Sequence, residues 1–168
     1  MVKKIKKYFY EETGMYIDWK QLNRLPEIDT LIDIGVGADG TPDLYERFND
    51  KALVLIDPLE EAEIFFNKHM SDHNALFFKT ALGDKTDNVT INVEDEIGRS
   101  TILNVTDINF ENDPVDRRVI SIKKLDDVVD NLKLGNIGIK IDTEGYELKI
   151  IRGANKTLKN TKFVIAEV

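Results

Sequence analysis

A buried strand that breaks into a glycine-rich turn constrains the fold of this chain more than any other feature. Residues 30–34 form a short apolar run with an acid near its end, and Gly35, Gly37 and Gly40 follow. A continuous apolar run of this length, bounded by glycine, indicates a buried strand. The glycines permit a sharp exit and let backbone N–H groups approach a ligand with no Cβ in the way. The stretch therefore predicts a strand followed by a ligand-binding turn.

Two carboxylates in and beside this turn narrow the choice of ligand. The spacing Gly35-x-Gly37-x-x-Gly40 matches the dinucleotide fingerprint, although such short glycine patterns are weak signals. Asp33 lies two residues before the first glycine, and Asp39 lies inside the turn, where a diphosphate would rest on backbone N–H groups. Both acids oppose an anionic diphosphate and suit a ligand with a positive ammonium and no phosphate. S-adenosylmethionine, an amino acid joined to a nucleoside through a sulfonium, is such a ligand.

The second apolar strand, residues 51–57, also ends in an acid. Asp57 follows the glycine turn at about the 20-residue spacing at which a carboxylate binds ribose hydroxyls in nucleoside-binding α/β folds. A carboxylate suits this role because it accepts from both hydroxyls of a vicinal diol. The alternative is that Asp57 only caps a helix opened by Pro58.

Strand-like and helix-like segments alternate along most of the sequence. We expect strands at 30–34, 51–57, 75–82, 137–142 and 163–168, helices after Pro42, at 59–69, at 125–132 and after Gly145, and an antiparallel pair at 88–93 and 117–124. This order predicts a Rossmann-like, doubly wound α/β fold, a mostly parallel sheet with helices on both faces. The predicted organisation is an N-terminal helical segment (1–26) and a binding domain (27–168) with an inserted hairpin and loop at about 86–124.

Candidate site residues gather at the predicted carboxyl ends of the strands, where sheets of this kind bind ligands. They are Asp33, Gly35, Gly37, Asp57, Ala81, Asp142 and Glu144. Acids in such positions also serve as helix caps, so this grouping alone does not prove a site. Lys140 alternates with two isoleucines, and its side chain is predicted either to point into the site or to pair with an acid.

With these residues in view, the chain resembles the FkbM-type methyltransferases, a class I S-adenosylmethionine-dependent family, over roughly residues 29–168. The matching segments are Asp33-Ile34-Gly35-Val36-Gly37, Ile56-Asp57-Pro58, Ala81-Leu82-Gly83-Asp84, Gly98-Arg99-Ser100-Thr101, Leu125-Asp126-Asp127, Ile139-Lys140-Ile141-Asp142-Thr143-Glu144-Gly145-Tyr146-Glu147-Leu148 and Arg152-Gly153-Ala154. The segment around Asp142 is the most specific. The family more often has Glu at the position of Asp57, so the charge is kept and the reach is shorter.

The resemblance implies a role for each part of the site. Asp33, Gly35 and Gly37 would hold the methionine part of the cofactor, Asp57 the ribose, and the Thr80-Ala81-Leu82 turn the adenine. Asp142 would orient the cofactor or the acceptor, and Glu144 or Asp142 would act as general base. Arg99, Ser100 and Thr101 would touch the substrate. The implied reaction is methylation of a hydroxyl on a sugar, a glycan or a small-molecule metabolite.

Several alternatives remain open from the sequence. Asp142, Glu144 and Glu167 supply enough oxygen ligands for a divalent cation, but caps and solvated acids explain them equally well. The glycine spacing keeps an NAD(P)-dependent oxidoreductase as a second hypothesis. A non-catalytic cofactor-binding domain is the third.

Composition and the ends of the sequence exclude some classes and suggest others. A net charge of −8 over 168 residues opposes general binding of nucleic acid. No apolar run approaches the roughly 18 residues of a membrane span, and no signal core follows the basic start, so we expect a cytoplasmic protein.

Class I methyltransferases usually continue past the fifth strand through a helix and a closing hairpin, which this sequence lacks. An uncovered fifth strand predicts a homodimer formed through that edge, marginal stability or partial loss of function.

Overall fold

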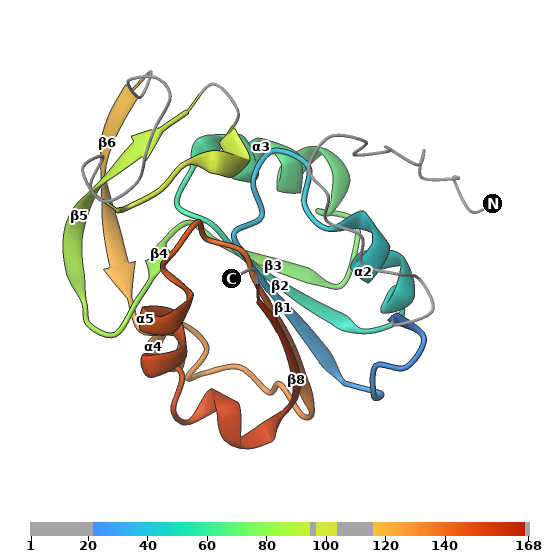
Figure 1. Cartoon of the computed structure of the whole chain (residues 1–168). Helices are drawn as coiled ribbons and strands as arrows, with labels where there is room; N and C mark the ends of the chain where they lie inside the picture. The colour runs from blue at the N-terminus through green and yellow to red at the C-terminus, as the bar shows by residue number, and fades with distance from the viewer. Residues whose placement is uncertain (1–21, 95–96, 104–115, 167–168) are drawn as a thin grey trace.

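The computed structural model describes residues 22–94, 97–103 and 116–166, and its centre is a five-stranded parallel sheet (Figure 1). The strand order is β3-β2-β1-β7-β8, with every neighbouring pair parallel. The strands are β1 (Thr30–Ile34), β2 (Ala52–Ile56), β3 (Ala75–Phe78), β7 (Ile137–Ile141) and β8 (Thr161–Ala166). The predicted Rossmann-like α/β fold is confirmed. Most of the predicted N-terminal helical segment lies outside the described residues.

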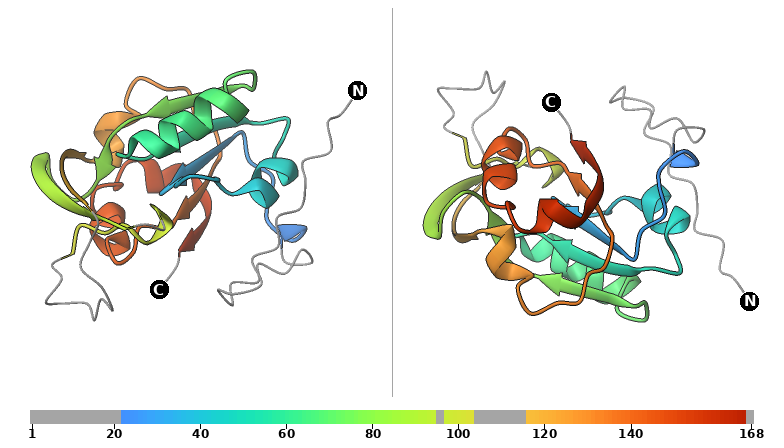
Figure 2. Two further views of the ribbon diagram at one scale, coloured as in Figure 1. Left: turned by 90° about the horizontal axis from the view of Figure 1, so that it is seen from above. Right: turned by 90° about the horizontal axis from the view of Figure 1, so that it is seen from below.

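Helices cover both faces of the sheet, as expected for a doubly wound fold. On one face, α2 (Pro42–Arg47) and α3 (Glu60–His69) pack on side chains such as Leu31, Leu53 and Leu55. On the other face, α4 (Leu125–Val128) and α5 (Glu147–Arg152) pack on the isoleucines of β1 and β7. Figure 2 shows these two layers from above and from below. Side chains alternate between the faces along each strand, so every residue of β1 and β7 is buried.

A second, three-stranded sheet lies beside the first, on the left of Figure 1, in the order β4-β6-β5. It consists of β4 (Ala81–Leu82), β5 (Asp87–Val93) and β6 (Asp116–Lys123), with β5 and β6 antiparallel and β4 and β6 parallel. The predicted single strand over 75–82 is therefore wrong, because it is two strands in two sheets. The chain changes sheets at Thr80, whose hydroxyl donates to the carbonyl of Ser121, on β6, at 3.0 Å.

The helices after β6 and β7 are shorter than the sequence pattern suggested. The expected helix over 125–132 ends at Val128, and the one after Gly145 ends at Arg152, followed by the 3-10 helix η2 (Thr157–Asn160). Asp126, in α4, contacts the start of η2. Its carboxylate accepts hydrogen bonds from the N–H groups of Lys156 and Thr157, each at 2.8 Å. This contact starts a new turn at η2, which local periodicity along either helix does not reveal.

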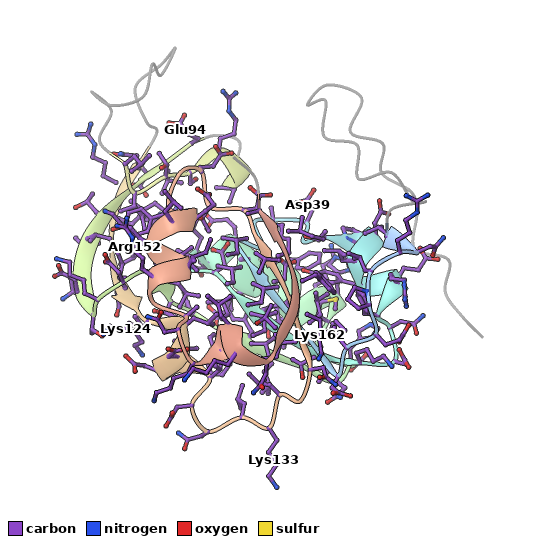
Figure 3. The ribbon with its side chains drawn as sticks, turned by 60° about the horizontal axis from the view of Figure 1, so that its bottom comes forward. Asp39, Glu94, Lys124, Lys133, Arg152 and Lys162 are labelled. Atoms are coloured by element: carbon purple, nitrogen blue, oxygen red, sulfur yellow. The ribbon has the colours of Figure 1, made fainter. Side chains whose placement is uncertain are left out.

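The order of the strands creates a switch point between β1 and β7. The chain leaves β1 toward one side of the sheet and returns to β7 from the other, so the loops after these strands diverge at one edge. Asp39 marks this edge, and Lys133, in the loop before β7, projects from the opposite end of the molecule (Figure 3). Ligands of open α/β sheets bind at such a switch point.

Two expectations stay predictions: the homodimer formed through the fifth strand and the cytoplasmic location. In the described part of the chain β8 is an edge strand, which is compatible with pairing of two copies but does not test it. Among the described residues, no helix is long and apolar enough to cross a membrane.

Candidate functional site

The glycine turn after β1 is held against both neighbouring strands. The N–H of Gly35 donates to the carbonyl of Ile56 at 3.0 Å, and the N–H of Asp142 donates to the carbonyl of Ile34 at 3.0 Å. Gly35 has a φ of 81°, and a Cβ there would lie 2.7 Å from the carbonyl carbon of Asp142 and would overlap its oxygen. Gly37 also has a positive φ, 61°. The turn therefore needs glycine both for its conformation and for the close approach of β7.

Asp57 follows β2 and holds the other side of the same turn. One carboxylate oxygen accepts the N–H of Gly37 at 3.0 Å, and the other accepts the N–H of Leu59 at 2.8 Å. Burial raises the pKa of the Asp57 carboxyl, while the N–H groups of Gly37, Leu59 and Val36 act in the opposite direction. The capping role that the sequence allowed is thus present, and the same carboxylate also faces the glycine turn.

A fully buried carboxylate lies below the turn, in β1. Asp33 is 1% exposed and accepts a hydrogen bond from the hydroxyl of Tyr45, which α2 contributes. Burial and the neighbouring Asp33 carboxylate raise the pKa of the Tyr45 hydroxyl well above its usual value, so this hydroxyl keeps its proton and donates. Among the described residues, the second oxygen of Asp33 has no hydrogen bond, although an ammonium lies nearby.

That ammonium belongs to Lys140, which joins three parts of the site. Its Nζ lies 3.3 Å from Asp33 Oδ1 and 3.3 Å from Asp142 Oδ2, and it donates to the carbonyl of Gly35 at 3.0 Å. Burial lowers the pKa of Lys140, but the Asp33 and Asp142 carboxylates raise it, and the net direction is upward. Lys140 therefore stays charged. The predicted pairing with acids is confirmed, and the same ammonium also contacts the glycine turn.

The loop after β7 is strained and internally bonded. Glu144 is exposed and has a φ of 51°, a left-handed conformation that costs energy for a residue with a side chain. The buried Glu147 carboxylate stabilises the loop, accepting from the N–H and hydroxyl of Thr143 and from the N–H of Gly145 at 3.0–3.1 Å. Strain of this kind at a loop beside a proposed site is compatible with a functional role for Glu144.

The inserted segment meets this loop through Thr101. The hydroxyl of Thr101 donates to the carbonyl of Glu144 at 2.8 Å, and its side chain is buried. Ser100 is also buried and accepts the N–H of Glu94, whereas Arg99 is exposed at the end of the 3-10 helix η1 (Ile97–Arg99). Of the three predicted substrate residues, Thr101 is thus fixed against the candidate catalytic loop.

Ala81 and Leu82 lie in the second sheet and not in the central one. Both are buried in β4, where Ala81 packs in a cluster with Leu59 and Tyr146 and Leu82 packs against the central sheet. With buried side chains, they could contact an adenine mainly through their backbone. Their role in cofactor binding stays a prediction.

The proposed metal site gains no support from the described residues, which include no group of three His, Cys, Asp or Glu side chains placed to hold an ion. Glu167, one of the three predicted ligands, lies outside the described residues. Asp142 instead pairs with Lys140.

Two residues of the site were missed as site residues by sequence reasoning. Tyr45 lies in the helix expected after Pro42 and was not singled out, and Glu147 was named only as part of a family motif. The hydroxyl of a buried tyrosine needs a partner, which is a general signal for such a contact but does not name Asp33 as the partner.

The assembled centre is acidic overall. Asp33 and Asp142 pair with one ammonium, that of Lys140, and Asp57 adds a third carboxyl group on the N–H of Gly37 in the glycine turn. This balance suits a ligand with positive charge and opposes a diphosphate.

Comparison with known proteins gives one family and one structural neighbour. The family model of the methyltransferase FkbM domain matches residues 33–168. A crystal structure of methyltransferase FkbM from Methylobacillus flagellatus KT is similar with a TM-score of 0.50 and 14% sequence identity, over 84% of this chain and 37% of that chain. The chain therefore corresponds to little more than a third of that protein, and the likeness shows the fold alone. Comparison with curated proteins gave no significant match.

Proposed function

The chain belongs to the FkbM methyltransferase family, and we propose that it transfers a methyl group from S-adenosylmethionine to a hydroxyl group of a sugar, a glycan or a small-molecule metabolite. The observation that supports this most strongly is the meeting of Asp33, Asp57 and Asp142 around the glycine turn at the switch point. All of these residues lie within the segment that matches the family.

The geometry fits the proposed cofactor in two respects. Gly35 and Gly37 carry no side chain, so the turn between them has only backbone groups to offer to the amino-acid part of the cofactor. The carboxylate of Asp57 lies against Gly37 and still has lone pairs beyond its two backbone hydrogen bonds, which could accept from ribose hydroxyls. The acidic balance favours this cofactor over a dinucleotide, and no contact favours the oxidoreductase alternative.

When bound, the cofactor would supply an electrophilic methyl group on a positive sulfonium. The protein's main contribution to such a displacement is to orient the two reactants. We assign this orienting role to Asp142, whose carboxylate is held by Lys140. We assign removal of the acceptor proton to Glu144, because its side chain is exposed at the end of the same strand.

The acceptor is proposed from the family and from the position of the insert. Thr101 ties the inserted segment to the carbonyl of Glu144, in the loop that would face the methyl group, and Arg99 and Ser100 directly precede it in the chain. Short polar side chains and a guanidinium suit the hydroxyl groups of a sugar or a polar metabolite.

Calorimetric titration with S-adenosylhomocysteine, with NAD as the comparison ligand, tests the proposal. We expect micromolar binding of the nucleoside and none of NAD. The variant Asp57→Asn should lose most of this binding, while Asp72→Asn, an exposed acid after α3, should bind like the original protein. Binding of NAD, or no binding of either ligand, would contradict the proposal.

A further inference from the structure

Lys140 is unusual because a buried ammonium links segments that are far apart in the sequence. It is 9% exposed, its ammonium donates a hydrogen bond to Gly35 in the turn after β1, and it forms ion pairs with Asp33 within β1 and with Asp142 after β7. Lys140 and Asp33 are partners in the parallel ladder between β7 and β1, so both side chains lie on the same face of the sheet. The lysine therefore joins the two strands that form the switch point.

The hydrogen bond to Gly35 determines how the glycine turn presents its backbone. In a trans peptide the carbonyl oxygen and the following N–H point in opposite directions, and the described chain has no cis peptide. The carbonyl of Gly35 points to Lys140, so the N–H of Val36 points away from it. The next peptide of the turn is held by Asp57, whose carboxylate accepts the N–H of Gly37 at 3.0 Å. Lys140 and Asp57 thus hold two neighbouring peptides of the same turn.

The charge of Lys140 has a second effect, on the acids. Asp33 is buried and Asp142 is partly buried, and each lies 3.3 Å from the same Nζ. Without the ammonium, two carboxylates would face each other across a poorly solvated space and repel. The other polar group on Asp33 is the Tyr45 hydroxyl, which is neutral and cannot replace the missing charge.

We propose that Lys140 is a positioning residue of the cofactor site: its ammonium orients the Gly35–Val36 peptide of the glycine turn and keeps Asp33 and Asp142 together. The inference rests on the proposed function, since it assumes that this turn binds the amino-acid part of the cofactor. In this role, binding of the cofactor depends on the positive charge at position 140. Packing of the side chain alone would not produce such a dependence.

Calorimetric titration with S-adenosylhomocysteine tests this on the whole chain. Lys140→Met keeps most of the length of the side chain but removes the charge, and should weaken binding at least about tenfold, as expected for loss of a charged hydrogen bond. Lys162→Met, at an exposed position of β8 (Figure 3), is the matched control and should bind like the original protein.

Chemical rescue separates charge from packing. Lys140→Ala removes the three carbons and the ammonium that propylammonium contains, so propylammonium should restore part of the binding, whereas 1-propanol at the same concentration and ionic strength should not. Unchanged binding in the methionine variant, equal rescue by the alcohol, or a loss in a folded alanine variant that propylammonium does not restore would overturn the inference.

Two controls make the outcome decisive. Circular dichroism establishes whether each variant is folded, and if removal of the charge unfolds the chain, Lys140→Arg takes the place of the uncharged variants. A folded arginine variant should retain binding within about tenfold, because the charge is kept; complete loss would overturn the inference.

If the original protein does not bind S-adenosylhomocysteine, the proposed function fails and this inference with it. If it binds and Lys140→Met binds equally, only the inference fails.

Discussion

Gly35 and Asp142 approach each other so closely that the carbonyl group of Asp142 occupies the place of a Cβ on Gly35. The contact joins the turn after β1 to the end of β7, and the N–H of Asp142 donates to Ile34 at 3.0 Å on the same side. The two halves of the switch point are therefore built against each other, and the proposed cofactor site depends on this contact.

Gly35→Ala should damage both stability and binding. The left-handed φ of 81° alone costs a residue with a Cβ about 1–3 kcal/mol, and overlap with Asp142 adds to this cost. We expect a lower thermal midpoint and no measurable binding of S-adenosylhomocysteine. Ala38→Ser, an exposed change in the same turn, should alter neither, and an alanine variant that binds normally would disprove the assigned contact.

Tyr45→Phe should change the response of stability to alkaline pH. Burial and Asp33 raise the pKa of Tyr45 in the folded state above its usual value of 10.0, so the neutral hydroxyl stabilises the fold below pH 10. As the pH rises above 10, the unfolded chain ionises first and this stabilisation is lost until the folded pKa is reached. Denaturant unfolding from pH 7 to pH 11 should show a steeper alkaline loss in the original protein than in the variant.

The same substitution should also lower stability at neutral pH. The phenylalanine ring leaves Asp33 Oδ2 without its donor, which costs about 1–3 kcal/mol for a buried polar group. Equal stability at pH 7 together with equal alkaline slopes would contradict the contact between these residues.

Glu144 and Glu147 should respond differently to the same Glu→Gln change. Glu144 is exposed, so Glu144→Gln should leave the unfolding free energy nearly unchanged and reduce methyl transfer by about 10²–10⁴-fold if it is the general base. Glu147 is buried and accepts three hydrogen bonds, so Glu147→Gln should lose about 1–3 kcal/mol of stability. Stability is measured by denaturant titration, and transfer with labelled cofactor and an acceptor found by screening. Full transfer activity in Glu144→Gln would remove its assigned role.

Thr101→Val should separate positioning of the catalytic loop from cofactor binding. The valine keeps the shape of the side chain but loses the 2.8 Å hydrogen bond to the carbonyl of Glu144, which costs about 1 kcal/mol. We expect slower methyl transfer with unchanged affinity for S-adenosylhomocysteine. Thr90→Val, at an exposed position of β5, is the matched control and should change neither quantity.

The central strands and the glycine turn were predictable because their signals are local. Apolar runs with an acid at or near their end located β1, β2 and β7, and glycine marked the turn after β1. The alternation of such strands with helices predicted the parallel sheet. The change of sheet at Thr80 was not predictable in this way. The hydrogen bond that accompanies this change joins Thr80 to Ser121 on β6, which is 41 residues away in the sequence. A local sequence pattern does not indicate a contact between residues so far apart.

The polar contacts of the candidate site were predictable only in part. The acids at the strand ends could be identified from their positions, but Lys140 contacts Gly35 across 105 residues, and this depends on the register of β7 against β1. Tyr45 reaches Asp33 because α2 packs over that face of the sheet, which helical periodicity shows only as an apolar stripe.

The most direct test of the account is a crystal structure of the protein with S-adenosylhomocysteine bound. We expect the amino-acid part of the ligand at the Gly35–Gly37 turn, the ribose hydroxyls within hydrogen-bond distance of Asp57, and the sulfur facing Asp142 and Glu144. Ligand bound elsewhere on the chain, or no bound ligand at saturating concentration, would contradict the account.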